Sequence, residues 1–241
     1  AGVAVPHQVF AHGWLLVGGQ KMSKSKATAI RPAQVTEHFG VDAYRYYFLK
    51  AINFGSDGSF SWEHMSAVYT SELANGYGNL ASRVTAMVGK YFDGVLPAPA
   101  DHGAAEDSVS EALAEAVAKA ESAIDRLALH EAIEATTEFV ARVNLYISEQ
   151  EPWKVAKDET ARERLATILY TSAEALRAIA VLYNPIMPRT SAQLWESLGA
   201  AASLGELSEQ RVQDAGRWGQ LPAGVVLTKG AGLFPRLAEE A

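Results

Sequence analysis

The 241-residue sequence predicts a mainly α-helical fold, a helix bundle preceded by the end of an α/β domain. From about residue 63 onward, apolar residues recur at helical spacing in stretches of about twenty residues separated by short breaks. The first thirty residues instead hold two short apolar runs followed by a glycine-bearing loop. A hydrophobic content of 49% with 20% charged residues is that of a globular chain long enough to bury a core.

The N-terminal segment, residues 1–31, is predicted to contain short strands at residues 9–12 and 14–17. Two strands cannot bury their own faces, so this segment is expected to be the end of a larger sheet. The chain also begins with Ala1 rather than methionine. We therefore expect the chain to be a fragment of a longer protein.

The next segment, residues 32–62, is predicted to connect that sheet to the bundle. Pro32 suits the first position of a helix, and Asp42 is expected to cap a helix over residues 43–51. Residues 53–59 are rich in Gly, Ser, Asn and Asp and are predicted to form a turn.

Residues 63–241 are predicted to form the bundle. Its amphipathic helices are expected at residues 63–92, 107–126, 130–150, 160–183 and 188–198, and residues 223–235 are expected to return as a short strand or loop. No apolar run is expected to reach the eighteen or so residues that a membrane span needs. The absence of cysteine excludes disulfides and Cys-type zinc sites in these residues.

The pentapeptide Lys21-Met22-Ser23-Lys24-Ser25 follows Gly18-Gly19-Gln20 and is the most informative motif in the chain. Lysine supplies a mobile positive charge, serine a short donor, and glycine a close approach of the backbone, which together suit a polyphosphate. A lysine-rich loop is otherwise an ordinary solvated turn. The full string, however, arises by chance in a chain of this length only on the order of once in ten thousand.

A polar stripe is predicted on the helix over residues 63–92. Asn75, Asn79 and Arg83 follow one another at a spacing of four and therefore share one face. Carboxamides and a guanidinium can read base edges, although such a stripe can equally be a plain solvent face. Gly76 and Gly78 each cost a helix roughly 1 kcal/mol, which indicates close approach by another segment or a ligand.

Trp153 follows Pro152, which is expected to end the helix over residues 130–150. Asn144 and Tyr146 are expected near the same end of the bundle. The tryptophan can be a core or lid residue, or an aromatic platform on which a base stacks.

The net charge of −7 is unevenly distributed. Residues 1–60 carry +3 and the remaining residues −10, which suits selective contact with a polyanion better than nonspecific coating. His7 and His12 lack further ligands at suitable spacing, so no metal site is expected.

The pentapeptide resembles the second signature of the class I aminoacyl-tRNA synthetases. The order and intervals of four further elements resemble the bacterial methionyl-tRNA synthetase family. These elements are Asp42 with Arg45-Tyr46-Tyr47, then Asn75 with Gly78-Asn79-Leu80, then Arg83, and then Glu151-Pro152-Trp153 with Lys157. The resemblance implies that residues 1–31 end a Rossmann-type catalytic domain, that residues 32–62 contact the tRNA stem, and that residues 63–241 bind the anticodon.

In that family the residues matching Lys21, Met22, Ser23, Lys24 and Ser25 grip the ATP phosphates, with Lys21 and Lys24 catalytic. The residues matching Asn75, Asn79, Arg83 and Trp153 recognise the CAU anticodon. The resemblance implies ATP as substrate with Mg²⁺, methionine, and tRNA(Met) including the initiator as partners. It also implies a cytoplasmic, monomeric enzyme without membrane contact.

The first class I signature, of the His-Ile-Gly-His type, is absent from the sequence, and the resemblance places the methionine pocket upstream of residue 1. The chain alone is therefore expected to be inactive in methionine activation. Three alternatives stay open: a non-catalytic tRNA-binding module, a synthetase of the Leu, Ile, Val or Cys type, and a protein-interaction scaffold.

Overall fold

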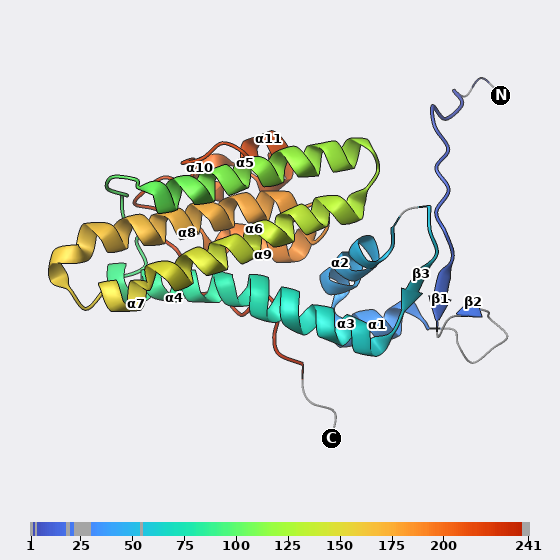
Figure 1. Cartoon of the computed structure of the whole chain (residues 1–241), viewed down its shortest axis with the longest axis horizontal. Coiled ribbons are helices and arrows are strands. Elements are labelled where there is room, and N and C mark those ends of the chain that lie inside the picture. The colour runs from blue at the N-terminus through green and yellow to red at the C-terminus, as the bar shows by residue number, and fades with distance from the viewer. Residues whose placement is uncertain (1, 3, 18–19, 22–29, 54, 238–241) are drawn as a thin grey trace.

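The computed structural model describes residues 2, 4–17, 20–21, 30–53 and 55–237, with only the backbone of residues 20–21. It consists of a bundle of long helices with a small sheet at one end (Figure 1). The predicted fold class, mainly α with a short strand-bearing N-terminal segment, is confirmed.

The sheet has the order β2-β1-β3. Strand β1 (Leu15–Val17) pairs antiparallel with β2 (Gln20–Lys21) and parallel with β3 (Gly58–Phe60). The predicted strand over residues 9–12 is wrong, because this exposed segment has no ladder partner among the described residues. The predicted turn over residues 53–59 is wrong at its end, where Gly58 donates its backbone N–H to Trp14 O at 2.9 Å and opens β3.

Two helices follow the sheet strands β1 and β2. Helix α1 (Pro32–Phe39) has proline at its first position, as predicted, and α2 (Val41–Ala51) follows it. The prediction that Asp42 caps its own helix is wrong. Asp42 lies buried inside the first turn of α2, and its Oδ2 accepts the backbone N–H of Thr190 at 2.6 Å, at the start of α9 (Pro188–Ser197).

The predicted helix over residues 63–92 is confirmed as one continuous run with an unpredicted change of winding. It consists of α3 (Trp62–Val68), the π-helical segment η1 (Tyr69–Gly78) and α4 (Asn79–Phe92), and it ends at Asp93 with φ 52°. A Cβ at Gly78 would lie 3.1 Å from Leu73 O and 3.6 Å from the backbone N of Phe234. The glycines predicted close approach by another segment. At Gly78 this approach is made by the backbone of the π-helical segment η1 itself and by the C-terminal segment around Phe234.

The remaining predicted helices are all present. They are α5 (Ala104–Asp125), α6 (Leu129–Gln150), α8 (Arg162–Tyr183) and α9, with short helical turns α7 (Pro152–Val155), η2 (Glu159–Ala161), α10 (Ala201–Leu204), η3 (Leu207–Glu209) and α11 (Val212–Ala215). The segment after α11 returns across the bundle as a loop, joined to the residues after α4 by one isolated bridge between Val95 and Val226.

Helix α8 differs from the amphipathic helix that the sequence predicted, because every residue from Leu165 to Tyr183 is buried. By length and composition, residues 159–183 could cross a membrane, contrary to the sequence-based expectation, but their most apolar window lies wholly inside the bundle. Helix α8 is thus the central core helix, around which α4, α5, α6 and α9 pack.

Candidate nucleic-acid interface

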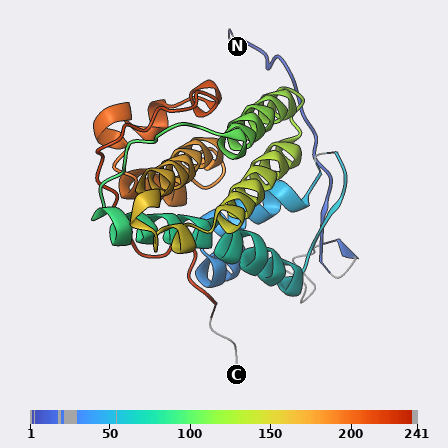
Figure 2. The same ribbon diagram turned by 60° about the vertical axis from the view of Figure 1, so that its left-hand side comes forward.

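Helix α4, α7 and the start of α8 meet at one end of the bundle (Figure 2). Of the predicted reading residues, Asn79 and Arg83 lie in α4 and Trp153 in α7, whereas Asn75 lies in the preceding segment η1. Asn75 and Asn79 are exposed, and Arg83 is half-buried. Trp153 is 39% exposed, and the Arg83 Cζ lies 5.7 Å from the centroid of its ring. The structure therefore brings together Arg83 and Trp153, which are seventy residues apart in the sequence; with Asn75 and Asn79 they form the set called here the reader surface.

The polar groups of the reader surface have unused bonding capacity. Among the residues that the structure describes, none hydrogen-bonds the side-chain amides of Asn75 and Asn79, and none pairs a carboxylate with Arg83. A cation over an indole ring is held by the ring quadrupole while its N–H donors stay available. This arrangement can stack a base on an aromatic ring and contact base edges beside it.

The backbone around Pro152 brings Trp153 to this surface. Helix α6 ends at Gln150, and Glu151 adopts the left-handed conformation with φ 44°, which turns the chain sharply. Pro152 is buried at the first position of α7, as its fixed φ favours. Lys154 Nζ lies 2.7 Å from the carboxylate of Glu151 and so links both sides of the turn.

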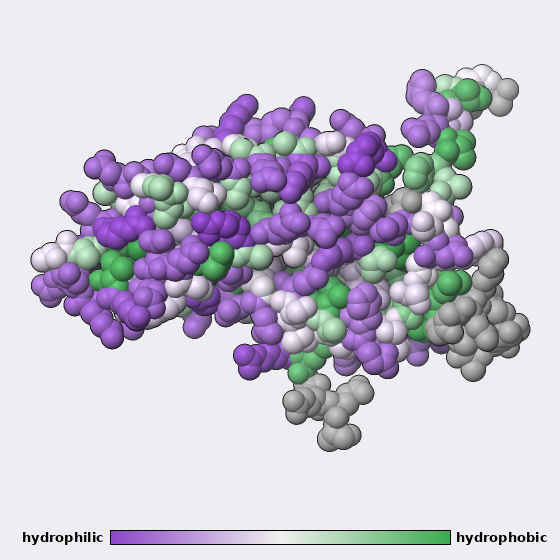
Figure 3. Space-filling model, in the orientation of Figure 1, coloured by the Kyte–Doolittle hydropathy of each residue, from purple (hydrophilic) through white to green (hydrophobic). Residues whose placement is uncertain are grey.

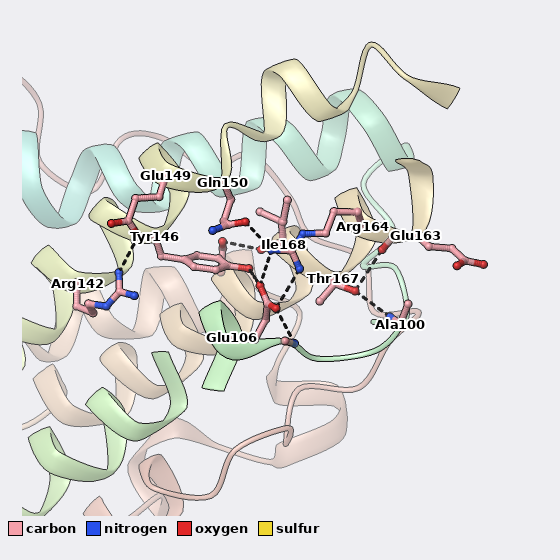
Figure 4. Close-up of polar contacts among 12 residues, drawn as sticks. Ala100, Glu106, Arg142, Tyr146, Glu149, Gln150, Glu163, Arg164, Thr167 and Ile168 are labelled. Carbon is pink, nitrogen blue, oxygen red and sulfur yellow. Dashed lines mark hydrogen bonds and ion pairs between the residues drawn. The ribbon is translucent and has the colours of Figure 1, made fainter. Parts of the chain in front are cut away.

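A polar cluster fixes the helix ends from which α7 emerges (Figure 4). Glu106 at the start of α5 is fully buried and accepts hydrogen bonds from Arg164 of α8 at 2.9 and 3.0 Å and from the Tyr146 hydroxyl of α6 at 2.5 Å. Arg164 also donates to Gln150 Oε1 at 2.5 Å. The first turn of α5, the last turns of α6 and the first turn of α8 are thereby held together.

Burial by itself raises the pKa of Glu106, but the hydrogen bonds from Arg164, Tyr146 and the Gly103 backbone outweigh it and lower this pKa to about 2. Sequence reasoning missed this cluster. Its one local signal was the spacing from Gly103 to Glu106, since the Glu106 carboxylate accepts the Gly103 N–H at 3.0 Å and caps the start of α5.

The π-helical segment that carries Asn75 is held from two sides. Asn144 of α6 donates its amide to Gly76 O at 3.2 Å, directly beside Asn75. On the other side, Glu72 accepts the Tyr46 hydroxyl at 2.5 Å and lies 2.5 Å from Lys50 Nζ. Burial raises the pKa of Tyr46, which keeps its hydroxyl a proton donor. Helix α2, the π-helical segment and α6 are thus linked by partly buried polar contacts.

The structure does not show the predicted phosphate-binding loop. The backbone of Lys21 lies in β2, whereas Met22, Ser23, Lys24 and Ser25 lie outside the described residues. Their role stays a prediction. Within the described part of the chain, no three His, Asp or Glu side chains gather as metal ligands.

Comparison with protein families identifies the class first. Residues 1–85 match the family described as tRNA synthetases class I (M), and residues 96–241 match the family described as the anticodon binding domain of methionyl tRNA ligase. The second match alone covers more than half of the chain. The chain therefore belongs to the methionyl-tRNA ligase family of class I synthetases.

Individual relatives agree with this assignment. The chain is 62% identical over 242 residues to the methionine–tRNA ligase of Streptomyces coelicolor, covering 99% of the chain and 45% of that protein. It is 40% identical over 239 residues to the Caldanaerobacter subterraneus methionine–tRNA ligase, covering 99% of the chain and 36% of the relative. The Mycobacterium tuberculosis methionyl-tRNA synthetase bound by methionyl-adenylate matches with a TM-score of 0.87 and 33% identity, over 97% of this chain and 45% of that one.

The chain thus spans less than half the length of these relatives. The comparisons support the methionine type over the Leu, Ile, Val and Cys types that the sequence had left open.

Proposed function

We propose that this chain supplies anticodon recognition to a methionine–tRNA ligase, which activates methionine with ATP and transfers it to tRNA(Met), including the initiator tRNA. The observation that carries the proposal is that the Arg83 guanidinium lies over the exposed ring of Trp153. Arg83 belongs to the continuous helical run that also presents Asn75 and Asn79. Trp153 stacks on one anticodon base, while Arg83 and the two asparagines contact base edges.

The proposal extends to the loop of residues 21–25. Lys21, Ser23, Lys24 and Ser25, with Met22 between them, grip the ATP phosphates, and the ammonium of Lys24 meets the charge that develops on the leaving pyrophosphate. Mg²⁺ enters bound to those phosphates rather than to a site of this chain. The enzyme acts as a monomer in the cytoplasm. Family membership across both matched regions supports a synthetase over a stand-alone tRNA-binding module or a protein-interaction scaffold.

Binding of anticodon stem-loop RNAs to this chain tests the proposal. A CAU stem-loop should bind more tightly than one with a changed anticodon at the same salt concentration. Arg83→Ala and Trp153→Ala should each weaken binding of the CAU stem-loop about tenfold, because a base stack or bidentate contact is worth about 1–3 kcal/mol. Binding of the changed stem-loop should stay almost the same.

The matched control is Arg31→Ala, which removes one exposed positive charge at the start of α1. It should lower affinity for both stem-loops equally, if at all. Circular dichroism first establishes that each variant remains helical. Equal losses for both stem-loops in Arg83→Ala and Trp153→Ala would make the reader surface a nonspecific or structural face and would refute the proposal.

A further inference from the structure

Three residues of the reader surface lie on a helical run that is free of acidic residues. Between residues 73 and 92 the chain has no Asp or Glu, and its charged side chains are those of Arg83 and Lys90. By contrast, α5 holds six acidic residues against one lysine, and α6 holds four against one arginine. Because acidic residues are concentrated on other helices, the face that α4 presents suits a polyanion.

Lys90 continues the reader surface along α4. It lies seven residues after Arg83, which is about 20° short of two full turns and a rise of about 10 Å, so both side chains leave the same face of the helix. Ala86 and Gly89, at neighbouring positions, carry no long side chain, and a Cβ at Gly89 would meet no atom within 4 Å. The helix face between the two cations is therefore open to a ligand.

The ammonium of Lys90 has unused bonding capacity. Lys90 is exposed, and no carboxylate of the described residues pairs with it. Its Nζ lies 5.2 Å from the ring centroid of the neighbouring Tyr91, a contact that leaves the N–H donors available. A lysine ammonium is a compact point charge, which binds a phosphate oxygen without reading a base.

A second lysine without a carboxylate partner among the described residues flanks the same helix. Lys229 belongs to the C-terminal segment where that segment passes Ser82 and Thr85 of α4, and the three residues line one small cavity. The backbone N–H of Thr228 donates to Ser197 O of α9 at 2.8 Å, which fixes the segment beside Lys229. The side chain of Lys229 itself is exposed and pairs with no described carboxylate.

The spacing of these groups fits an RNA strand whose anticodon lies on the reader surface. Nucleotides of a stacked strand rise about 3.4 Å each, so about three nucleotides cover the distance along α4 from Arg83 to Lys90. Phosphate contacts fix the register of a nucleic acid, whereas base contacts supply its sequence preference. Lys90 can thus hold the backbone beside the triplet while Arg83 contacts a base.

We propose that Lys90 and Lys229 form a phosphate-binding track, which holds the phosphodiester backbone of the anticodon loop on the face that α4 presents. The proposal rests on the proposed function and adds to it the group that these two lysines bind. The track supplies affinity and orientation, and it leaves the choice of anticodon to the reader surface.

The salt dependence of stem-loop binding tests the track. Lys90→Ala should weaken binding of the CAU stem-loop and of a stem-loop with a changed anticodon by the same factor, about two- to fivefold, as for an exposed ion pair. It should also lower the slope of log affinity against log salt concentration by about 0.7–1, because one phosphate contact fewer releases fewer counterions. Lys229→Ala should act alike, and Lys90→Arg, which keeps the charge, should retain the wild-type slope.

A scan of methylphosphonate linkages, each of which removes one backbone charge from the RNA, locates the contact. At one position in the loop, this change should weaken binding to the wild-type chain as much as Lys90→Ala does. The same RNA should bind Lys90→Ala with no further loss, because both changes remove one and the same contact.

The matched control is Lys119→Ala, which changes the net charge by the same amount on α5, across the bundle from α4 (Figure 1). Its salt slope should equal that of the wild type. An unchanged slope for Lys90→Ala or for Lys229→Ala, or an equal drop for Lys119→Ala, would overturn the track and leave the proposed function intact where CAU discrimination persists. A greater loss for the CAU stem-loop than for the changed one would also overturn it, since the lysine would then read a base. A wild-type chain that does not discriminate CAU would refute the proposed function and the track with it.

Discussion

Two arginines on long helices of this molecule use their guanidinium groups in opposite ways. Arg177 of α8 is 1% exposed and donates to Glu174 at 2.9 Å and to three backbone carbonyls of the segment after η3. Arg83 of α4 is half-buried, and its guanidinium lies 5.7 Å from the centroid of the Trp153 ring and makes no hydrogen bond or ion pair with the described residues. The first arginine joins the C-terminal segment to the core helix, and the second keeps its donors available for a ligand.

The difference shows that burial decides what a charged side chain can do. Glu174, the partner of Arg177, is fully buried and also accepts the backbone N–H groups of Gln220 and Leu221 at 3.0 and 2.9 Å. A buried pair with every group satisfied stabilises one arrangement of the chain. Hydrophilic residues cover much of the face of the bundle that Figure 3 shows. Exposed polar side chains such as those of Asn75 and Asn79 contribute little to stability and are free to select a partner.

Breaking the buried pair should have the largest effect. Arg177→Ala leaves the Glu174 charge buried without its partner and should lower the free energy of unfolding by about 3–5 kcal/mol. Urea unfolding followed by circular dichroism measures this change. Arg83→Ala is the matched control and should shift stability by no more than about 0.5 kcal/mol. Similar losses for the two variants would erase the distinction between these arginines.

The buried carboxylate of Glu106 should give the chain a dependence of stability on pH. Its pKa is lowered from 4.5 to about 2, so its contribution is complete above about pH 4.5 and is lost as the pH falls toward 2. The wild type should exceed Glu106→Gln in stability at pH 6 by roughly 3 kcal/mol. This advantage should shrink steadily below pH 4.5. An advantage that does not change between pH 6 and pH 3 would show that Arg164 and Tyr146 do not stabilise the charged form.

Two glycines of the long helix should respond to alanine with opposite signs. At Gly89 a Cβ meets no atom within 4 Å, so Gly89→Ala should stabilise α4 by about 0.5–1 kcal/mol. At Gly78 the Cβ would lie 3.1 Å from Leu73 O and 3.7 Å from Phe234 Cβ. Gly78→Ala should therefore destabilise the chain by on the order of 1 kcal/mol. Equal gains at both positions would show that the π-helical segment does not require glycine.

Much of the helical architecture could be predicted because it depends on local signals. The periodic apolar residues, Pro32, Pro152 and the turn after Phe92 placed every long helix within a few residues. Strand β3, the winding of η1 and the buried role of Asp42 could not be predicted. Strand β3 and the role of Asp42 depend on partners distant in sequence, β1 for Gly58–Phe60 and the Thr190 N–H for Asp42.

In the candidate site, too, local features could be predicted from the sequence and tertiary contacts could not. Spacing on one helix predicted that Asn75, Asn79 and Arg83 share a face, and Pro152 predicted a break before Trp153. The contact between Arg83 and Trp153 needed the tertiary fold, as did the support from Glu106 and Asn144. The sequence predicted an amphipathic helix over residues 160–183, but α8 is buried on all sides from Leu165 to Tyr183. A helix at the centre of a bundle has no solvent face and so needs no polar side.

The most direct test of the central claim, that Arg83 reads the anticodon, is a cycle that crosses Arg83→Ala with base changes in the RNA. Affinity is measured for wild type and variant with CAU and with a single replacement at each triplet position. The account predicts a coupling energy of about 1–3 kcal/mol at one position and additive losses at the other two. Additive losses at all three positions would contradict it, because Arg83 would then contribute charge without reading a base.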